Sequence, residues 1–554
     1  MSKFLENTVR MSLHKLLVYA ALAASPLTIA RATSPLPVIW QGNPPASPEI
    51  HGAGAVGFYT GTPVFWTIPA TGNAPIRYSA NQLPHGLSLD PSTGTITGTL
   101  SEPGNYQFTV VAKNRAGDAS RTISFVAGDT VALTPPMGWN SYDAYGDDVT
   151  ESETLANAKY VHDKLLPYGW DTVTADYRWY DPGASTAPNN PNARAGVQLT
   201  MDGSGRLLPA VNRFPSAADG KGFTALAVQI HAMGLKFGIH IMRGIPRIAV
   251  QQNLPIDGSS YTAAEAANTA DTCPWCPDMY GVKGDTPAGQ AYYDSLFRLY
   301  ASWGVDFVKM DDTSQPYHAD EITAVRSAIG KCGRSIVYSL SPGETPVVDA
   351  LHVADHSNMW RMSGDFWDNW RSLNHSFELD YRWEGIGGPG HWPDSDMLPV
   401  GHLSVDGRSV GPNRETRFTL PEQMTLISLW CLQPAPLMVG ADLPDNDQWT
   451  LSLLTNPEVL ALDQDPVTSG AVRVKSSDGM EIWSRNLSDG SLAVGIFNRA
   501  QADSQVTVHW SDLRLFGSQT VRDLWLRKNL GTFHDQITLP VLSHGVVLLR
   551  LTES

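Results

Sequence analysis

The stretch AGQAYYDSLFRLYASWGVDFVKMDD, residues 288–312, holds one helix-like segment followed by one strand-like run. AGQAYYDSLFRLYASWG is helix-like, and VDFVKMDD is a short apolar run typical of a buried strand. The same alternation continues over residues 133–470, with further strand-like runs such as LKFGIHIM, SIVYSLSP and APLMVGADL. Repeated units of this kind predict a parallel sheet, most economically a (β/α)8 TIM barrel. An open doubly wound sheet is the alternative, but the G-x-G-x-x-G turn that would support it does not follow the first strand.

Two regions with the texture of antiparallel β-structure flank this central part. Residues 40–128 alternate polar and apolar positions between Pro, Gly and Asn turns, which predicts an N-terminal immunoglobulin-like β-sandwich. We interpret this module as a spacer or packing domain, with carbohydrate attachment as the alternative. Residues 471–554 contain strand-like runs joined by Asp-Gly turns, which predict a C-terminal antiparallel β-sandwich. The chain is therefore expected to be multidomain.

Residues 1–32 have the pattern of a signal peptide. Lys3, Arg10 and Lys15 supply positive charge, LLVYAALAA is an apolar core, and Ala-Arg-Ala at 30–32 is a cleavage site. We expect the mature protein to be secreted or periplasmic. No other segment approaches eighteen apolar residues, so no membrane span is expected in the mature protein.

Charge and composition narrow the class of partner. Asp and Glu total 55 against 39 Lys and Arg, a net charge of −16. That field repels nucleic acid and anionic membranes and favours a neutral ligand. Seventeen Trp and eighteen Tyr supply flat faces of the kind on which sugars stack. Of the four cysteines, Cys273 and Cys276 have C-x-x-C spacing, for which a local disulfide is preferred over a redox motif or half a zinc site.

Several polar residues end the apolar runs, where barrel enzymes carry their catalytic groups. Side chains alternate along a strand, so Lys309 and Asp311 share one face while Met310 and Asp312 share the other. A lysine within an apolar strand is costly to bury unpaired, which places Lys309 and Asp311 at the barrel mouth. Two carboxylates from different strands suit the cleavage of glycosides, and no Ser-His-Asp order or HExxH motif competes. The strand-end residues are Asp176, His240, Lys309, Asp311, Arg361 and Asp365.

Seven sequence motifs follow one another along the chain. LTPPMGWNSYDAYG, GLKFGIH, WGVDFVKMDD, WRMSGDFWDNW, GGPGHWPDSDMLPVG, QPAPLMVGADL and LALDQDP occur in this order. They resemble glycoside hydrolase family 27, the family of α-galactosidases and α-N-acetylgalactosaminidases, and the resemblance covers about residues 133–554. It implies a retaining mechanism without metal or organic cofactor, with Asp311 as nucleophile and Asp365 as general acid/base. A retaining pair should lie about 5–5.5 Å apart, and Asp365 should have the higher pKa.

The resemblance also implies how the sugar is held. Asp176 matches a residue that binds the outer hydroxyls, and Lys309, Arg361 and Asp396 match binders of the ring hydroxyls, with Met397 beside them. For the neighbouring carboxylates a structural role is favoured; these are Asp312, Asp368 and Asp394.

Four positions depart from the family pattern and bear on the substrate. Tyr142 replaces a tryptophan, and Tyr177 replaces a second aspartate after Asp176. His240 replaces a tyrosine, and we expect the His240 side chain in the pocket because it lies at the end of a strand. Ser341 stands where galactosidases carry a glutamate for the 2-hydroxyl, unless Glu344 restores that contact in a shifted loop.

The leading prediction is a secreted retaining exo-glycosidase of the α-galactosidase type, acting on oligo- or polysaccharides. α-N-acetylgalactosaminides, β-L-arabinopyranosides and isomalto-dextran remain open as substrates, because one altered hydrogen-bonding position can change the preferred sugar. Outside catalysis, the alternatives are a glycan-binding protein on the same scaffold and an adhesion protein built on the immunoglobulin-like module. Whether the protein forms a homo-oligomer stays open.

Overall fold

The computed structural model describes residues 37–184, 199–407, 410–467 and 469–554, which belong to one compact unit. The predicted signal peptide at residues 1–32 lies outside these ranges. Within them, no helix combines the length and apolar character that crossing a membrane requires.

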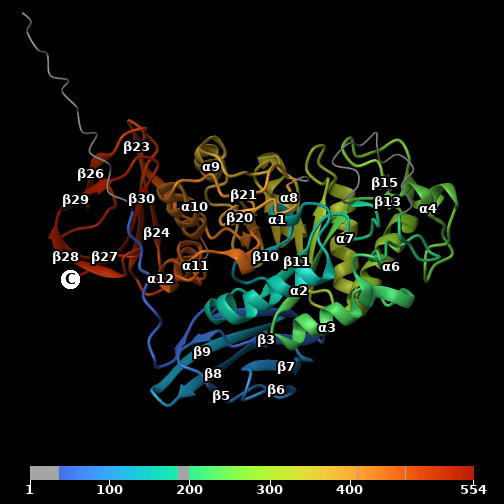
Figure 1. The fold of residues 1–554 in the computed structure, drawn as a ribbon, viewed down its shortest axis with the longest axis horizontal. Coiled ribbons are helices and arrows are strands. Elements are labelled where there is room, and N and C mark those ends of the chain that lie inside the picture. Colours follow the sequence, from blue (N-terminus) through green and yellow to red (C-terminus); the bar gives the residue numbers. More distant parts are fainter. Residues whose placement is uncertain (1–36, 185–198, 408–409, 468) are drawn as a thin grey trace, which may run out of the picture. The chain divides into compact units, whose positions relative to one another are not determined.

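A ring of eight parallel strands forms the centre of the molecule, and the (β/α)8 barrel is confirmed (Figure 1). The order of the strands around the sheet follows the chain, with the first strand beside the last. A parallel bridge between Leu398, just after the seventh strand, and Val439 in the eighth closes the ring. The strands are β10 (Met137–Asn140), β11 (Thr172–Ala175), β12 (Lys236–Met242), β16 (Phe307–Asp311), β17 (Val337–Leu340), β18 (Met359–Arg361), β19 (Trp392–Asp394) and β22 (Leu437–Val439).

Helices follow the strands and cover the outside of the barrel. The helix predicted from residue 288 is α6 (Pro287–Trp303): it begins where Thr286 Oγ1 accepts the Gly289 N–H and ends at Gly304, whose φ of 87° suits glycine. The other helices are α1 (Tyr142–Tyr145), α2 (Glu151–Tyr160), α3 (Thr224–Ala232), α4 (Arg247–Gln251), α5 (Ala263–Ala266), α7 (Ala319–Lys331), α8 (Ala350–His356), α9 (Trp370–Arg382), α10 (Leu420–Leu432), α11 (Gln448–Leu454) and α12 (Pro457–Asp463).

The N-terminal module is a β-sandwich of the immunoglobulin-like class, drawn in blue in Figure 1. One sheet has the order β2-β9-β8-β5 and the other β3-β7-β6, and Phe108, Phe125 and Trp66 pack between them. The strands are β1 (Glu49–Ile50), β2 (Ala55–Tyr59), β3 (Pro63–Thr67), β4 (Ala70–Thr71), β5 (Arg77–Asn81), β6 (Leu87–Leu89), β7 (Thr95–Thr99), β8 (Gly104–Asn114) and β9 (Gly117–Gly128).

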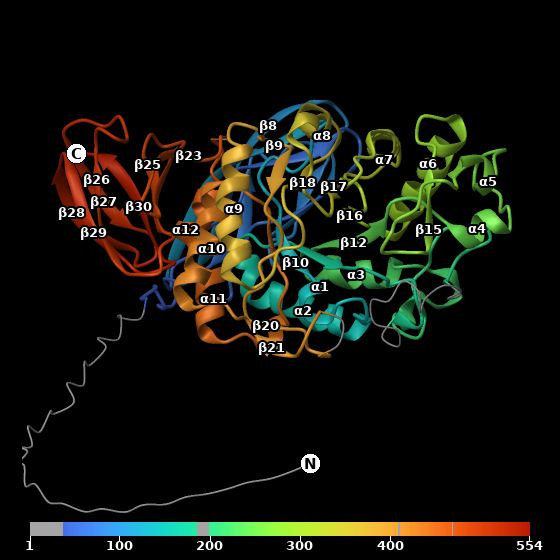
Figure 2. The same cartoon turned by 90° about the horizontal axis from the view of Figure 1, so that it is seen from above.

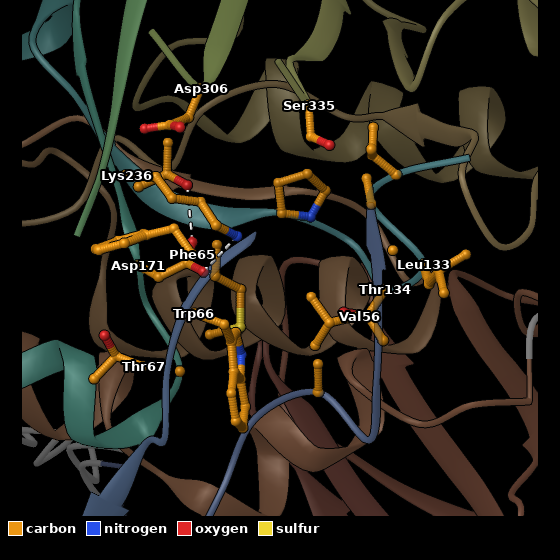
Figure 3. Close-up of a pocket in the computed structure, with 18 of the residues that line it drawn as sticks. Val56, Phe65, Trp66, Thr67, Leu133, Thr134, Asp171, Lys236, Asp306 and Ser335 are labelled. Atoms are coloured by element: carbon orange, nitrogen blue, oxygen red, sulfur yellow. Dashed lines mark hydrogen bonds and ion pairs between the residues drawn. The ribbon is translucent and has the colours of Figure 1, made fainter. Parts of the chain in front are cut away.

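This module contacts the amino-terminal end of the barrel. The Tyr59 N–H donates to Ser335 Oγ at 2.8 Å, and Thr67 Oγ1 donates to the Gly234 carbonyl at 3.0 Å. A cavity of about 100 Å³ lies between the two parts (Figure 3). Its charges are paired, as Lys236 with Asp171 at 2.7 Å. Small volume and neutralised charge fit a packing interface rather than a ligand site.

The C-terminal domain is an antiparallel β-sandwich, as expected. One sheet has the order β23-β24-β25-β30-β27-β28, and β26 pairs with β29. Helix α10, nearly all of whose residues are buried, contacts β25 and β30 of this domain and also α9 of the barrel (Figure 2). The strands are β23 (Val472–Ser477), β24 (Met480–Asn486), β25 (Leu492–Asn498), β26 (Ser504–His509), β27 (Ser518–Asp523), β28 (Lys528–His534), β29 (Gln536–Val541) and β30 (Val546–Glu553).

Candidate active site

A cavity of about 440 Å³ opens at the carboxyl-terminal ends of the barrel strands. This volume is within the range of small-molecule sites, roughly 300–1,000 Å³. It collects most of the predicted site residues from several different loops and strands. These are Tyr142, Asp176, Tyr177, Lys309, Asp311, Ser341, Arg361, Asp365, Asp396 and Met397.

Alternation along β16 brings Lys309 and Asp311 to this cavity, while Met310 is fully buried in the core. Asp312 turns away and forms an ion pair with Arg243 at 2.8 Å, which fits its expected structural role. The Asp311 side chain is 16% exposed, and its Oδ2 lies 3.0 Å from His240 Nε2. Its Oδ1 accepts the Asp312 N–H at 3.0 Å. Asp311 is therefore held in one orientation at the floor of the cavity.

Asp365 lies in the loop after β18, at the mouth of the same cavity. Its side chain is 63% exposed, and Arg361 Nη2 approaches its Oδ1 at 3.4 Å. One carboxyl is thus fixed and enclosed, while the other is close to solvent. The separation and the relative pKa values of the pair stay predictions.

Asp176 and Lys309 form a buried ion pair on the cavity wall, with Lys309 Nζ 3.0 Å from Asp176 Oδ2. Burial alone would raise the pKa of Asp176, but the charges of Lys309 and His240 and the hydrogen bonds from Asn140 and the Tyr177 N–H lower it to about 2. Burial would likewise lower the pKa of Lys309, but the surrounding carboxylates raise it. Both groups are charged at neutral pH.

Arg361 organises the opposite side of the cavity. Its Nη2 lies 2.7 Å from Asp396 Oδ2, and its Nη1 donates to Ser341 Oγ at 3.4 Å. Asp396 also accepts the Phe366 N–H at 2.8 Å, which ties it to the loop that carries Asp365. Asp394 accepts the Asp396 N–H at 2.8 Å and so supports this arrangement from behind.

Aromatic side chains form a third side of the cavity. The Tyr177 ring meets the rings of Tyr142, His240 and Trp275 at centroid distances of 6.5, 5.3 and 6.0 Å. Only 5% of Tyr177 is exposed. A fixed aromatic ring therefore occupies this part of the cavity wall.

One expected residue and one alternative residue do not line the cavity. His240 is fully buried and does not line the cavity, because its position on β12, paired with Lys309, directs the ring behind Asp311. Glu344 does not replace the family glutamate, since it pairs on the surface with His375 and Arg382. Ser341 itself therefore lines the cavity.

The cysteines also differ from expectation, because Cys273 and Cys276 are unpaired thiols rather than a local disulfide. Cys276 is buried beside Arg178, whose Nη2 approaches Sγ at 3.9 Å, and beside Asp278 at 3.6 Å. These polar partners hold the thiol within the loop without a covalent bond.

Sequence reasoning missed several residues that line the cavity. Trp275 lines the cavity and lies between Cys273 and Cys276. The C-x-x-C motif is formed by the two cysteines and does not mark the tryptophan between them. Trp367 lies in the motif of Asp365, and Asp143 lies in the opening motif beside Tyr142. The others are Arg178, Pro342, Gly343, Gly364 and Phe366.

One group of potential metal ligands lies outside the cavity. Among the described residues, Asp271, His318 and Glu321 bring their ligand atoms within 4.8 Å of one another. The guanidinium of Arg243 already lies there, with Nη1 2.8 Å from Asp271 and 2.6 Å from Glu321. An arginine supplies the positive charge that a metal ion would otherwise bring.

A carboxylate pair at the mouth of a (β/α)8 barrel, surrounded by cations and aromatic rings, defines the class of the protein as a glycosidase. Family models agree: residues 279–465 match Alpha galactosidase A, residues 477–551 match the Alpha galactosidase C-terminal beta sandwich domain, and residues 49–128 match the "Putative Ig domain".

Individual relatives agree as well. A family 27 β-L-arabinopyranosidase from Geobacillus stearothermophilus is 49% identical over 76% of this chain and 97% of its own, with a TM-score of 0.73. A "putative alpha-N-acetylgalactosaminidase" from Bacillus halodurans C-125 is 44% identical over 76% of this chain and 98% of its own, with a TM-score of 0.68. An α-galactosidase from Cyamopsis tetragonoloba is 28% identical over 77% of this chain and 88% of its own. The chain belongs to glycoside hydrolase family 27.

Proposed function

We propose that the protein is a retaining exo-glycosidase. Asp311 attacks the anomeric carbon of a terminal sugar while Asp365 protonates the departing glycosidic oxygen, so the sugar becomes an ester of Asp311. Asp365 then takes a proton from water, which attacks the anomeric carbon and releases Asp311 as a carboxylate. The observation that carries this proposal is that both carboxyls line one cavity at the carboxyl-terminal ends of the strands.

The surroundings of each carboxyl fit its proposed role. Lys309 is cationic and lies near Asp311, where it stabilises the carboxylate that attacks. The 63% exposure of the Asp365 side chain lets it meet both the leaving group and incoming water.

We further propose that the preferred terminal sugar is a β-L-arabinopyranoside. This sugar has the ring configuration of an α-D-galactopyranoside but carries no exocyclic hydroxymethyl group. Tyr177 supports the proposal, because its buried ring stands where the family has an aspartate for the 4- and 6-hydroxyls. A ring removes a hydrogen-bonding partner and fills space that the hydroxymethyl group would need. The Geobacillus relative, which is named for this activity, points the same way.

The second candidate substrate is an α-D-galactoside, which was the leading prediction from the sequence. Asp176 remains ionised on the cavity wall and can still accept hydrogen bonds from outer hydroxyls. Several curated relatives are named α-galactosidases. The small Ser341 side chain leaves room for a 2-acetamido group on the sugar. α-N-acetylgalactosaminides are therefore included among the substrates tested.

The test is the rate of hydrolysis of p-nitrophenyl β-L-arabinopyranoside, α-D-galactopyranoside, α-N-acetylgalactosaminide and α-glucoside, with product stereochemistry followed by NMR. We expect the highest kcat/KM on the arabinopyranoside, with retention, and no turnover by Asp311→Asn. Tyr177→Asp should shift the ratio of kcat/KM towards the galactoside. Preference of the wild type for the galactoside would favour the second candidate, and inversion would overturn the mechanism.

We propose, finally, that the protein is exported. The charged and apolar segments of residues 1–32 support this proposal. N-terminal sequencing of protein from the culture medium or periplasm should begin after Ala32, and an unprocessed protein retained in the cytoplasm would contradict export.

A further inference from the structure

Asp143 is a carboxyl of the cavity to which the mechanism above gives no task. It lies in α1, directly after β10, is 3% exposed, and lines the cavity beside Tyr142. Its Oδ2 atom is enclosed and has no hydrogen-bond partner in the described part of the chain. Because Oδ2 is enclosed, the carboxyl reaches the cavity through Oδ1.

The fold leaves a space of fixed shape for this carboxyl. Gly440 follows β22, the strand beside β10, and a β-carbon built there would lie 2.2 Å from Asp143 Oδ2 and 2.6 Å from Asp143 Cγ. Such distances are far inside van der Waals contact. A residue with a side chain at 440 would displace Asp143. The Ser404 N–H also holds the Asp143 carbonyl at 2.8 Å.

The surroundings favour the neutral form of this carboxyl. Burial raises the pKa of Asp143 well above its usual value, and the nearby carboxylates Asp396, Asp176 and Asp365 raise it further, while Lys309 lowers it. An enclosed Oδ2 without a donor would be a poor place for negative charge. The proton therefore belongs on Oδ1, where it faces the cavity and can be donated.

We propose that Asp143 is a substrate-binding residue that donates a hydrogen bond to a ring hydroxyl of the terminal sugar. It supplies a further carboxyl to the cavity, from the segment that follows β10. The inference rests on the proposed function, since it adds a contact to the same bound sugar.

Variants of Asp143 separate binding from packing. Asp143→Ala should raise KM by about 10- to 100-fold and change kcat less, because a buried hydrogen bond to the substrate is lost. Asp143→Asn should keep most of kcat/KM, because an amide has the shape of the neutral acid and an N–H that can point into the cavity. Gly440→Ala, which touches only Asp143 among its nearest atoms, should raise KM as Asp143→Ala does.

Asp380 in α9 provides the matched control. It is also 3% exposed, its Oδ2 also lacks a partner in the described residues, and burial raises its pKa, but it does not line the catalytic cavity. Asp380→Ala should lower the melting temperature without changing KM. An equal change of KM in Asp143→Ala and Asp380→Ala would overturn the proposal.

Monodeoxy substrates identify the contact and test it independently of folding. The 3-deoxy and 4-deoxy forms of the best aryl glycoside are compared on wild type and Asp143→Ala. We expect the difference between the two proteins to disappear for the analogue that lacks the contacted hydroxyl. A difference that persists on both analogues and on the 2-deoxy form as well would overturn the proposal.

The parent substrate is whichever glycoside the wild type hydrolyses fastest. Turnover of the galactoside in place of the arabinopyranoside would contradict the proposed sugar. The role of Asp143 would then be tested with the galactoside and its deoxy forms. If no glycoside is cleaved, calorimetric titration with L-arabinose and D-galactose replaces the rates, and wild type that binds neither contradicts both proposals.

Discussion

Asp311 and Asp365 line one cavity but differ in depth, with side-chain exposures of 16% and 63%. Asp311 is held by His240 and by the backbone N–H of Asp312. In the proposed mechanism these contacts fix the direction of its attack. Among the described residues, Asp365 has one longer contact, to Arg361, so in the proposed mechanism it can follow the leaving group. The two residues should therefore respond differently to the chemistry of the substrate.

Asp365→Asn should lower kcat/KM on a disaccharide by about 10²–10⁴-fold, the usual contribution of a general acid. The leaving group of a dinitrophenyl glycoside departs without protonation. For this substrate the same variant should show a much smaller loss in the rate of the first step, in which the ester of Asp311 forms. Asp311→Asn should be inactive on both substrates, because no ester can form. Equal losses on the two substrates in Asp365→Asn would contradict its role as acid.

The Asp176–Lys309 pair links stability to pH. The pKa of Asp176 in the folded protein, about 2, lies below its unfolded value of about 3.9, so the ionised form stabilises the fold above pH 4. This contribution, about 3 kcal/mol, is lost as the pH falls from about 4 to about 2. The difference in Tm between wild type and Asp176→Asn should thus be larger at pH 5 than at pH 3. A difference independent of pH would show that Asp176 acts through packing alone.

Among the elements, the segment between β14 (Ala267–Asn268) and β15 (Met279–Val282) carries Trp275 into the cavity. Trp275 is 38% exposed and packs on Tyr177, so its ring is available to a sugar face or an aglycone. The element adds an aromatic surface that the barrel strands themselves do not provide.

Trp275→Ala should raise KM by about 3- to 10-fold, the size of an aromatic contact, with kcat little changed. Michaelis–Menten kinetics on the preferred aryl glycoside measure both values. Phe516→Ala is the control, because Phe516 is an 85% exposed aromatic of the C-terminal domain and does not line the cavity. Unchanged kinetics in Trp275→Ala would place the tryptophan outside the bound substrate.

At the scale of the whole molecule, the immunoglobulin-like module contacts the end of the barrel opposite to the carboxylates. Its hydrogen bonds go to Ser335 and Gly234, which precede β17 and β12 at their amino-terminal ends. The module therefore supports the barrel without reaching the cavity.

Deletion of residues 37–128 should leave kcat/KM on small aryl glycosides close to that of the full chain. The Tm should fall, because apolar surface at the base of the barrel becomes exposed. Kinetics and thermal unfolding of both proteins measure the two effects. Loss of activity at a temperature where the shortened protein remains folded would show that the module contributes to the cavity.

Much of the architecture was predictable from local pattern. Runs such as VDFVKMDD form buried strands because their apolar residues leave no solvent-facing side. The helix before this run begins after Thr286, which caps its first turn, and ends at Gly304. Alternation of side chains along the strand is enough to separate Lys309 and Asp311 from Asp312. These features depend on residues adjacent in the chain, so they can be read from the sequence.

Contacts between distant segments could not be predicted in this way. His240 has the sequence position of a cavity residue but lies behind Asp311. The C-x-x-C pair has the spacing of a disulfide but consists of two thiols, of which Cys276 lies beside Arg178. Trp275 belongs to no motif, and the motif that contains Asp143 does not show that its carboxyl reaches the cavity. Asp143 fits only because Gly440, about 300 residues later in the sequence, lacks a side chain. These points depend on the fold, because burial, charge and space at each side chain are set by neighbours that come together only in the folded chain.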